Sequence, residues 1–209
     1  MDFFSDAIFL QWMDTLSDEN LVVIDDFLPE PLFEKAIDLL HKKQEEDAFK
    51  KAALGDAFSR QVISEIRGDF AYWLDKKRDT ELNSFFLLVE ELISKLNRYC
   101  YLSLSGYEFH LTHYPKGSYY KKHLDQFKDR NNRLISVLIY LNQNWKEGDG
   151  GELKVYEKEG SRVIKPIANR CVIFKSDVVE HEVLPTEVSR YSLTGWLLYM
   201  PSGVGYILS

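Results

Sequence analysis

The feature that most constrains the fold is a change in the spacing of apolar residues about halfway along the chain. In the first half, apolar side chains recur every three or four residues, which is typical of amphipathic helices. In the second half they alternate with polar ones, as in 108–114 and 190–196, which is typical of strands with one buried face. Helices followed by many short strands predict an α+β fold, with a sheet sandwich or barrel packed on helices.

Three helices are predicted in the first half. The second begins near Pro31, a residue that fits the first turn of a helix, and the third covers 80–99 with a wide apolar face. Segment 55–69 is less periodic and predicts a loop or loose hairpin. The first helix rests on apolar residues at every fourth position, namely Phe4, Ile8, Trp12 and Leu16.

Turn signals separate the strands of the second half, and no repeat or linker interrupts the chain. We therefore expect a single domain over 1–209, with 1–100 mainly helical support plus a substrate loop and 101–200 forming the core. Further β-rich runs are 134–141 and 171–174, and 158–162 predicts a hairpin turn.

Composition excludes several classes of protein. Of 209 residues, 45% are hydrophobic and 28% are charged, which is typical of globular proteins. The net charge of −7 argues against non-specific nucleic-acid binding. No apolar run approaches the roughly 20 residues of a membrane-spanning helix, and the first residues lack the pattern of a signal peptide. Two cysteines, Cys100 and Cys171, are too few for a disulfide scaffold, so we expect reduced thiols and a cytoplasmic protein. We expect a monomer or weak dimer.

A histidine and an aspartate two residues apart provide the first candidate site. On a strand, His123 and Asp125 point to the same side. A second imidazole from another strand, for which His181 is the best candidate, completes a two-histidine, one-carboxylate set of the kind that binds non-haem Fe(II). A surface histidine beside a surface aspartate is the alternative for an isolated His-x-Asp.

The strand after His181 supports the metal-site interpretation. Arg190, Ser192, Thr194 and Trp196 share one of its faces, which predicts a polar-lined pocket rather than a dry core. An inward guanidinium requires an anionic partner, and a carboxylate fits its planar geometry best.

Together these residues resemble the Fe(II)- and 2-oxoglutarate-dependent dioxygenases. Within that superfamily the sequence resembles the prolyl 4-hydroxylases of the HIF prolyl hydroxylase type, especially their bacterial branch. The resemblance is carried by 66–69 with Tyr72 and Trp73, 114–115, 123–125, 139–142 with Trp145, 150–153, and 181–185 leading to 190–196.

The resemblance implies a double-stranded β-helix (jelly-roll) core with N-terminal supporting helices. It implies Fe(II), 2-oxoglutarate and O2 as cofactor and co-substrates, with ascorbate as a further candidate. It implies that Arg190, assisted by Tyr140, pairs with the distal carboxylate of 2-oxoglutarate. It also implies His123, Asp125 and His181 as iron ligands, and Tyr114, Thr194 and Trp196 as lining residues of the cofactor pocket. From the residues alone, Tyr140 would be interpreted as a core aromatic with a satisfied hydroxyl. Tyr114 and Trp196 could be packing residues of the wall, and for Trp196 the two interpretations are equal.

Three further residues are candidates for contact with substrate. In relatives, the block that contains Arg67 and Asp69 adjoins a loop that closes over the peptide, which would be 55–65 here. A local pair that shapes a turn is the alternative for these two residues. Arg133 is a further candidate substrate contact. His110 and His113 lie on opposite faces of their strand and are interpreted as structural, as is His41 on a helix surface.

The resemblance implies hydroxylation of a peptidyl proline, possibly at C4, with release of succinate and CO2. A translation factor such as elongation factor Tu is the first partner to test, and neither nucleic acid nor membrane is expected as a partner. One alternative is an oxygenase of a free amino acid or other small molecule, and another is a catalytically silent jelly-roll that binds a ligand or partner. A structural zinc domain fits less well, because such sites prefer four ligands and usually cysteine.

Overall fold

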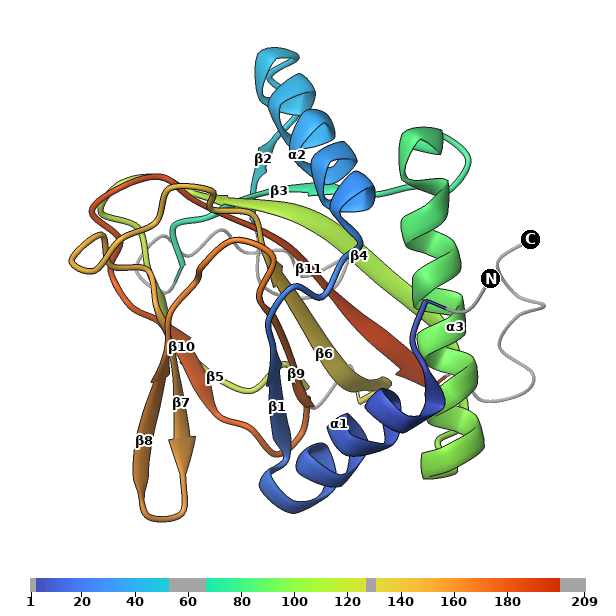
Figure 1. The fold of residues 1–209 in the computed structure, drawn as a ribbon. Helices are drawn as coiled ribbons and strands as arrows, with labels where there is room; N and C mark the ends of the chain where they lie inside the picture. The colour runs from blue at the N-terminus through green and yellow to red at the C-terminus, as the bar shows by residue number, and fades with distance from the viewer. Residues whose placement is uncertain (1–2, 53–66, 127–130, 200–209) are drawn as a thin grey trace.

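The structure, a computed structural model, describes residues 3–52, 67–126 and 131–199. Within these residues the strands form two antiparallel sheets, in the orders β1-β9-β6-β11-β4-β3-β2 and β5-β10-β7-β8 (Figure 1). The larger sheet contains β1 (Leu21–Ile24), β2 (Lys50–Lys51), β3 (Phe70–Trp73), β4 (Leu104–Tyr114), β6 (Arg133–Tyr140), β9 (Cys171–Lys175) and β11 (Arg190–Tyr199). The smaller sheet contains β5 (Tyr120–His123), β7 (Leu153–Glu157), β8 (Gly160–Ile164) and β10 (His181–Val183).

The two sheets pack face to face, which confirms the predicted jelly-roll core. Apolar side chains from both sheets form one buried cluster between them, including Tyr114 and Phe174 from the larger sheet and Val155 and Val183 from the smaller. The predicted hairpin at 158–162 is also confirmed, since it joins β7 to β8.

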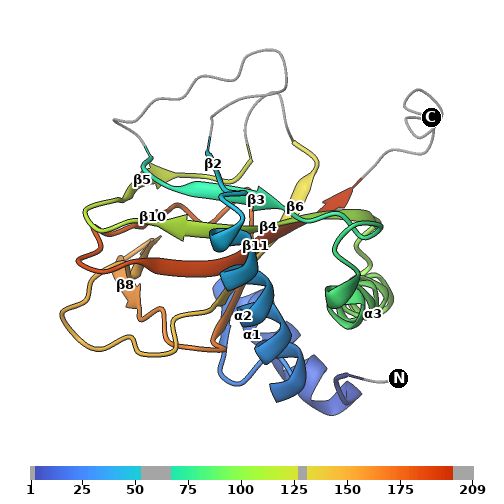
Figure 2. The same ribbon diagram turned by 90° about the horizontal axis from the view of Figure 1, so that it is seen from above.

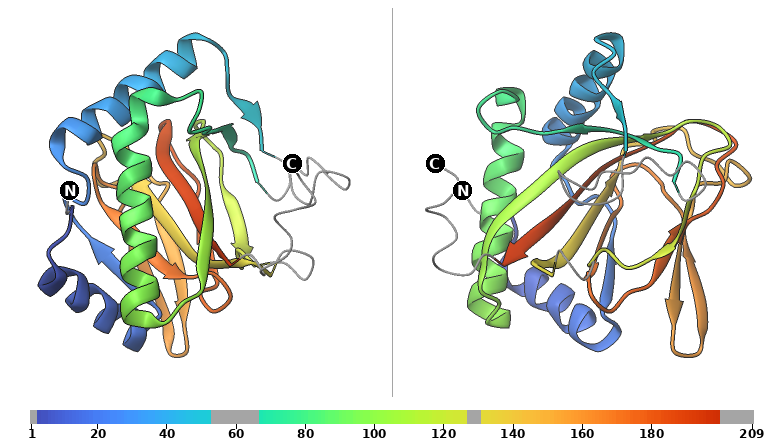
Figure 3. Two further views of the ribbon diagram at one scale, coloured as in Figure 1. Left: turned by 90° about the vertical axis from the view of Figure 1, so that its right-hand side faces the viewer. Right: turned by 180° about the vertical axis from the view of Figure 1, so that it is seen from behind.

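Helices cover the outer face of the larger sheet (Figures 2 and 3). They are α1 (Asp6–Glu19), α2 (Glu30–Glu45) and α3 (Asn83–Cys100), with the short 3-10 helix η1 (Thr80–Leu82) leading into α3. Their apolar faces share a second buried cluster with Phe109, Leu111, Leu193 and Leu197 of β4 and β11. None of the described helices is long and apolar enough to span a membrane.

The predicted apolar stripe of the first helix is confirmed at Phe4 and Leu16 and wrong at Ile8. Ile8 is 48% exposed, whereas Phe9, Met13 and Leu16 form the buried face. The cause is that a helix turns every 3.6 residues, so positions four apart drift around it. Ser5 caps the first turn by accepting a hydrogen bond from the amide of Ile8, so the helix begins after Phe4.

A strand that the periodicity did not predict follows α1 directly. Asn20 adopts the left-handed conformation (φ 62°) that commonly ends a helix, and β1 starts one residue later. β1 then pairs antiparallel with β9, with Leu21 opposite Phe174. Residues from the first half of the chain therefore contribute to the larger sheet as well as to its helical cover.

Strand β11 lies between β4 and β6 and presents chemically different faces to the two layers. Leu193 and Leu197 point to the helices, whereas Arg190 and Ser192 are buried on the face toward the smaller sheet. The pairing places Arg190 opposite Tyr114 of β4 and Ser192 opposite Tyr140 of β6. Polar and aromatic side chains are thus brought together on the inner face of the sandwich.

Candidate active site

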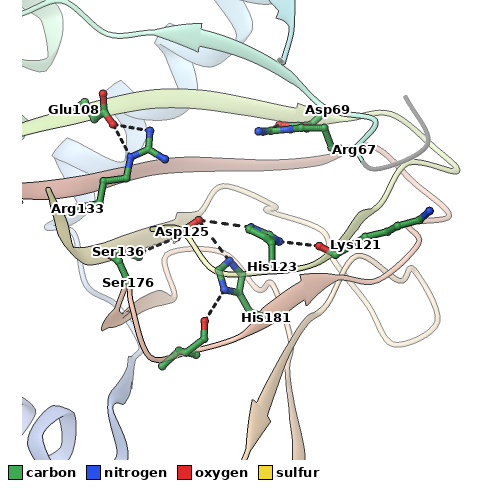
Figure 4. Close-up of polar contacts among 11 residues, drawn as sticks. Arg67, Asp69, Glu108, Lys121, His123, Asp125, Arg133, Ser136, Ser176 and His181 are labelled. Carbon is green, nitrogen blue, oxygen red and sulfur yellow. Dashed lines mark hydrogen bonds and ion pairs between the residues drawn. The ribbon is translucent and has the colours of Figure 1, made fainter. Parts of the chain in front are cut away.

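The structure brings together the three predicted metal ligands. His123 ends β5, Asp125 follows it, and His181 begins β10, where it pairs directly with His123. One ligand atom from each of the three residues lies within 4.8 Å of those of the others. The Oδ1 atom of Asp125 is 3.5 Å from Nε2 of His123 and 3.8 Å from Nε2 of His181 (Figure 4).

Backbone carbonyls orient both imidazoles for metal binding. Nδ1 of His123 is 2.7 Å from the carbonyl oxygen of Lys121, and Nδ1 of His181 is 3.0 Å from that of Val179. Since a carbonyl only accepts, each Nδ1 carries the proton and each Nε2 keeps a lone pair toward the cluster. Burial also lowers the pKa of His181 to about 4, so its ring is neutral, the form that binds metals, at physiological pH.

Two serines fix the third ligand. The hydroxyl of Ser136 donates to Oδ2 of Asp125 at 2.6 Å and lies 2.8 Å from the hydroxyl of Ser176. Burial alone would raise the pKa of Asp125, but the adjacent imidazoles and the Ser136 hydroxyl lower it below its ordinary value. Asp125 is therefore a carboxylate with one oxygen anchored and the other directed at the histidines.

The buried guanidinium of Arg190 forms a second polar centre on the same inner face. The side chain is 1% exposed, and its Nε donates to the carbonyl of Gly151 at 2.8 Å. Its Nη2 has no hydrogen-bond partner among the described residues, and neither has the hydroxyl of Tyr140, whose ring lies 5.1 Å from the guanidinium carbon. The ring of Tyr114 lies 4.9 Å from the same guanidinium carbon.

Gly151 allows the close approach to Arg190. Its φ of +74° is in the region that favours glycine, and an added Cβ would lie 3.0 Å from Cδ of Arg190. Thr194 is another predicted pocket residue on β11. Its hydroxyl lies 3.0 Å from that of Ser192, which is two residues from Arg190 in the strand.

Arg67 and Asp69 form a bidentate ion pair beside the metal ligands. The two hydrogen bonds measure 2.7 and 2.6 Å, and Asp69 is fully buried. The Arg67 guanidinium lies 4.4 Å from the ring centre of Tyr120, and that ring stacks on His123 at 3.6 Å. The structure therefore links the pair to the metal site through one aromatic ring. The predicted closing loop, 55–65, lies outside the described residues.

Arg133, which was predicted to contact substrate, is fixed by its neighbours in the structure. It is 7% exposed, forms an ion pair with Glu108 at 2.6 Å, and lies 3.5 Å from the ring centre of Trp196. Trp196 is itself buried, and its indole N–H has no partner among the described residues. Arg133 thus packs on Trp196 with its charge paired, and its contact with substrate stays a prediction.

Sequence reasoning did not show that His110 lies on the inner face of the larger sheet. It is 3% exposed on the inner face of β4, whereas His113 on the outer face stacks on Tyr191 and contacts the Ser189 hydroxyl. Alternation showed that the two histidines lie on opposite faces, but both are equally polar, so the sequence could not show which one faces the pocket. His41 is exposed, as predicted.

The residues present fit an iron ion and an anionic co-substrate. Two imidazole nitrogens and one carboxylate oxygen leave coordination positions open, as non-haem Fe(II) requires. The unpaired Nη2 of Arg190 and the unpaired hydroxyl of Tyr140 are buried donors suited to a carboxylate. A metal ion and a dicarboxylate can therefore both be held between the sheets.

Comparisons with known proteins identify this combination of fold and site. The family model of the 2OG-Fe(II) oxygenase superfamily matches residues 109–198. A prolyl-4-hydroxylase from Pseudomonas putida is 30% identical and superposes with a TM-score of 0.83, covering 91% of this chain and 98% of that one. A prolyl hydroxylase from Trichoplax adhaerens, solved with a hypoxia inducible factor peptide fragment, is 27% identical with a TM-score of 0.80, covering 95% and 96% of the two chains.

A curated relative agrees with these matches. An uncharacterized PKHD-type hydroxylase of Synechocystis sp. is 29% identical over 125 residues, which is 51% of this chain and 41% of that protein's length. The chain belongs to the 2OG-Fe(II) oxygenase superfamily, and the structures it resembles include prolyl hydroxylases. Its cofactor is Fe(II), and its co-substrates are 2-oxoglutarate and O2.

Proposed function

We propose that this protein hydroxylates a prolyl residue of a peptide or protein, at C4 of the ring. The observation that carries the proposal is similarity over more than nine tenths of the chain to two prolyl hydroxylases, one of them solved with a peptide. The complete set of buried ligands and the unpaired Arg190 support an active enzyme rather than a silent jelly-roll.

The chain's own residues have distinct tasks in this proposal. His123, Asp125 and His181 hold the iron, and Arg190 with Tyr140 holds the distal carboxylate of 2-oxoglutarate. When bound, the iron with 2-oxoglutarate and O2 supplies the oxidation that places one oxygen atom on a C–H carbon, while 2-oxoglutarate leaves as succinate and CO2.

The fold orients these groups and keeps water away from them. The metal ligands and Arg190 extend from opposing sheets into the space between them, where apolar side chains exclude solvent. The Ser136 hydroxyl and the two backbone carbonyls fix the ligands before the metal arrives, so little side-chain entropy is lost on binding. Tyr114, Thr194 and Trp196 complete the cofactor pocket in this proposal.

A peptide is the substrate class that the similar structures favour. The Arg67–Asp69 pair lies just before β3 and beside the metal site. From there it can position a peptide at the iron. Elongation factor Tu is the first protein partner that we propose to test, and the cytoplasmic location stays a prediction. A hydroxylase of free amino acids is the second candidate, because it would need the same iron and 2-oxoglutarate residues.

A substrate panel tests the proposal. The iron-loaded enzyme is incubated aerobically with 2-oxoglutarate and proline-containing peptides, including peptides from elongation factor Tu, or with free proline. We expect the mass of one oxygen atom to be added to proline within a peptide, with 4-hydroxyproline on hydrolysis. Hydroxylation of free proline but of no peptide would replace our proposal with the second candidate.

A further inference from the structure

His110 is a buried imidazole that serves neither the metal site nor the Arg190 centre. Its Nδ1 is buried and has no hydrogen-bond partner among the described residues. Its ring packs against two indoles, with centroids 4.6 Å from Trp73 and 5.4 Å from Trp196, and the two indoles also contact each other at 6.3 Å. Trp73 is the strand partner of His110 and is 45% exposed, so His110 lies beside an aromatic side chain that reaches the protein surface.

The strand register shows where this imidazole faces. His110 pairs with Thr194 of β11, two positions along the strand from the pairing of Thr112 with Ser192 and four from that of Tyr114 with Arg190. It therefore lies on the same inner face as the Arg190 centre, but farther along the sheet and beside Trp196.

Charged groups of the metal site and of the predicted substrate contact act on His110. Burial lowers its pKa to about 3, helped by Arg67 and Arg133 and opposed by Asp69 and Asp125. The last of these is a metal ligand, and the Arg67–Asp69 pair is the predicted substrate contact. These charged groups are therefore near enough to act on His110, whose ring is neutral at physiological pH.

A histidine with a purely structural role normally satisfies its ring nitrogens. A buried polar atom without a partner costs free energy that an apolar side chain of similar size would not cost. The indole N–H of Trp196 and the hydroxyl of Thr112 are also buried and without partners among the described residues. Besides Nη2 of Arg190 and the hydroxyl of Tyr140, which we assign to 2-oxoglutarate, three unpaired polar groups thus lie on this inner face. They indicate a site for a further hydrogen-bonding ligand.

We propose that His110 determines substrate affinity by donating a hydrogen bond from Nδ1 to a main-chain carbonyl of the bound peptide beside the target proline. The stacked contact with Trp196 and the tilted contact with Trp73 hold the imidazole in position. A carbonyl fits because proline has no N–H and offers only an acceptor. This inference rests on the proposed peptidyl-prolyl activity and adds a residue to its substrate site.

Three variants test the inference. His110→Leu keeps the size but loses the hydrogen bond, and His110→Asn keeps an N–H near the position of Nδ1. His113→Leu is the matched control, since it removes a histidine from the same strand on the opposite face. Each protein is assayed for kcat and KM with a prolyl peptide that the wild type hydroxylates, for the KM toward 2-oxoglutarate, and for Tm without substrate. Binding of the same peptide is also measured without oxygen, with Mn(II) and 2-oxoglutarate bound.

We expect His110→Leu to raise the peptide KM and Kd about tenfold, equivalent to about 1.4 kcal/mol. We expect the KM for 2-oxoglutarate to stay unchanged and Tm to stay level or rise by roughly 2–4 °C, because an unpaired buried group is removed. His110→Asn should restore most of the peptide affinity, and His113→Leu should leave it unchanged.

Two results would overturn the inference about His110 alone. The first is an unchanged peptide KM and Kd in His110→Leu. The second is a lower Tm in both His110 variants without rescue by asparagine, which would make the residue structural. A wild-type enzyme that hydroxylates no prolyl peptide would instead contradict the proposed function, and the inference would fall with it.

Discussion

Replacing Arg190 with methionine tests the assignment of the co-substrate site. The guanidinium is 1% exposed, and its Nη2 has no partner among the described residues. If the distal carboxylate of 2-oxoglutarate binds there, the variant must bury that carboxylate without its cation. Breaking a buried ion pair in this way costs about 3–5 kcal/mol. At about 1.4 kcal/mol per tenfold change, the Kd for 2-oxoglutarate should rise between roughly a hundredfold and a few thousandfold.

The assay is a titration of 2-oxoglutarate into metal-loaded protein without oxygen. Binding is measured by calorimetry or by thermal shift. At a concentration of about 100 Kd the wild type should gain about 2.7 kcal/mol of stability from binding, and the variant almost none. Arg98→Met is the matched control, because Arg98 is exposed on α3. Metal binding should be equal in all three proteins. A Kd for 2-oxoglutarate within threefold of wild type in Arg190→Met would refute the assignment.

Three further predictions concern the metal site and acid stability. His181→Ala should abolish iron binding and turnover together, and full turnover in that variant would remove His181 from the ligand set. Ser136→Ala should weaken iron affinity roughly 10- to 100-fold by freeing Oδ2 of Asp125, as followed by metal titration, and unchanged affinity would contradict that role. Because the pKa of His110 falls from about 6.5 in the unfolded chain to about 3 in the fold, acidification below pH 6.5 protonates only the unfolded state and costs stability. His110→Leu should therefore lose about 1 kcal/mol less than wild type between pH 7 and pH 5.5 in urea unfolding, and an equal loss would show that His110 is protonated in the fold.

Much of the site could be predicted because its residues follow local rules. The two-residue spacing of His123 and Asp125 places both side chains on one side of a strand end, and strand alternation places Arg190 and Trp196 on one inner face. Pairing of β11 with β6 then brings Tyr140 to the guanidinium, as the resemblance implied.

The features that could not be predicted depend on contacts between distant parts of the chain. The pairing of Arg133 with Glu108 joins two strands 25 positions apart, and it exists only once β11 lies between them. β1 is four residues long and is stabilised by its pairing with β9, far along the chain, so its periodicity alone gave little signal. The inward direction of His110 likewise follows from the sheet, not from its neighbours in sequence.

The most direct test of the proposed prolyl hydroxylation is to follow labelled oxygen from O2 into a prolyl peptide. Enzyme with Fe(II), 2-oxoglutarate and isotopically labelled O2 is compared with the same mixture without oxygen and with the His181→Ala variant. We expect labelled 4-hydroxyproline in the peptide and one succinate per hydroxylation, with neither formed in the two controls. Succinate formed at the same rate with and without peptide, and no label in proline, would contradict the proposed function.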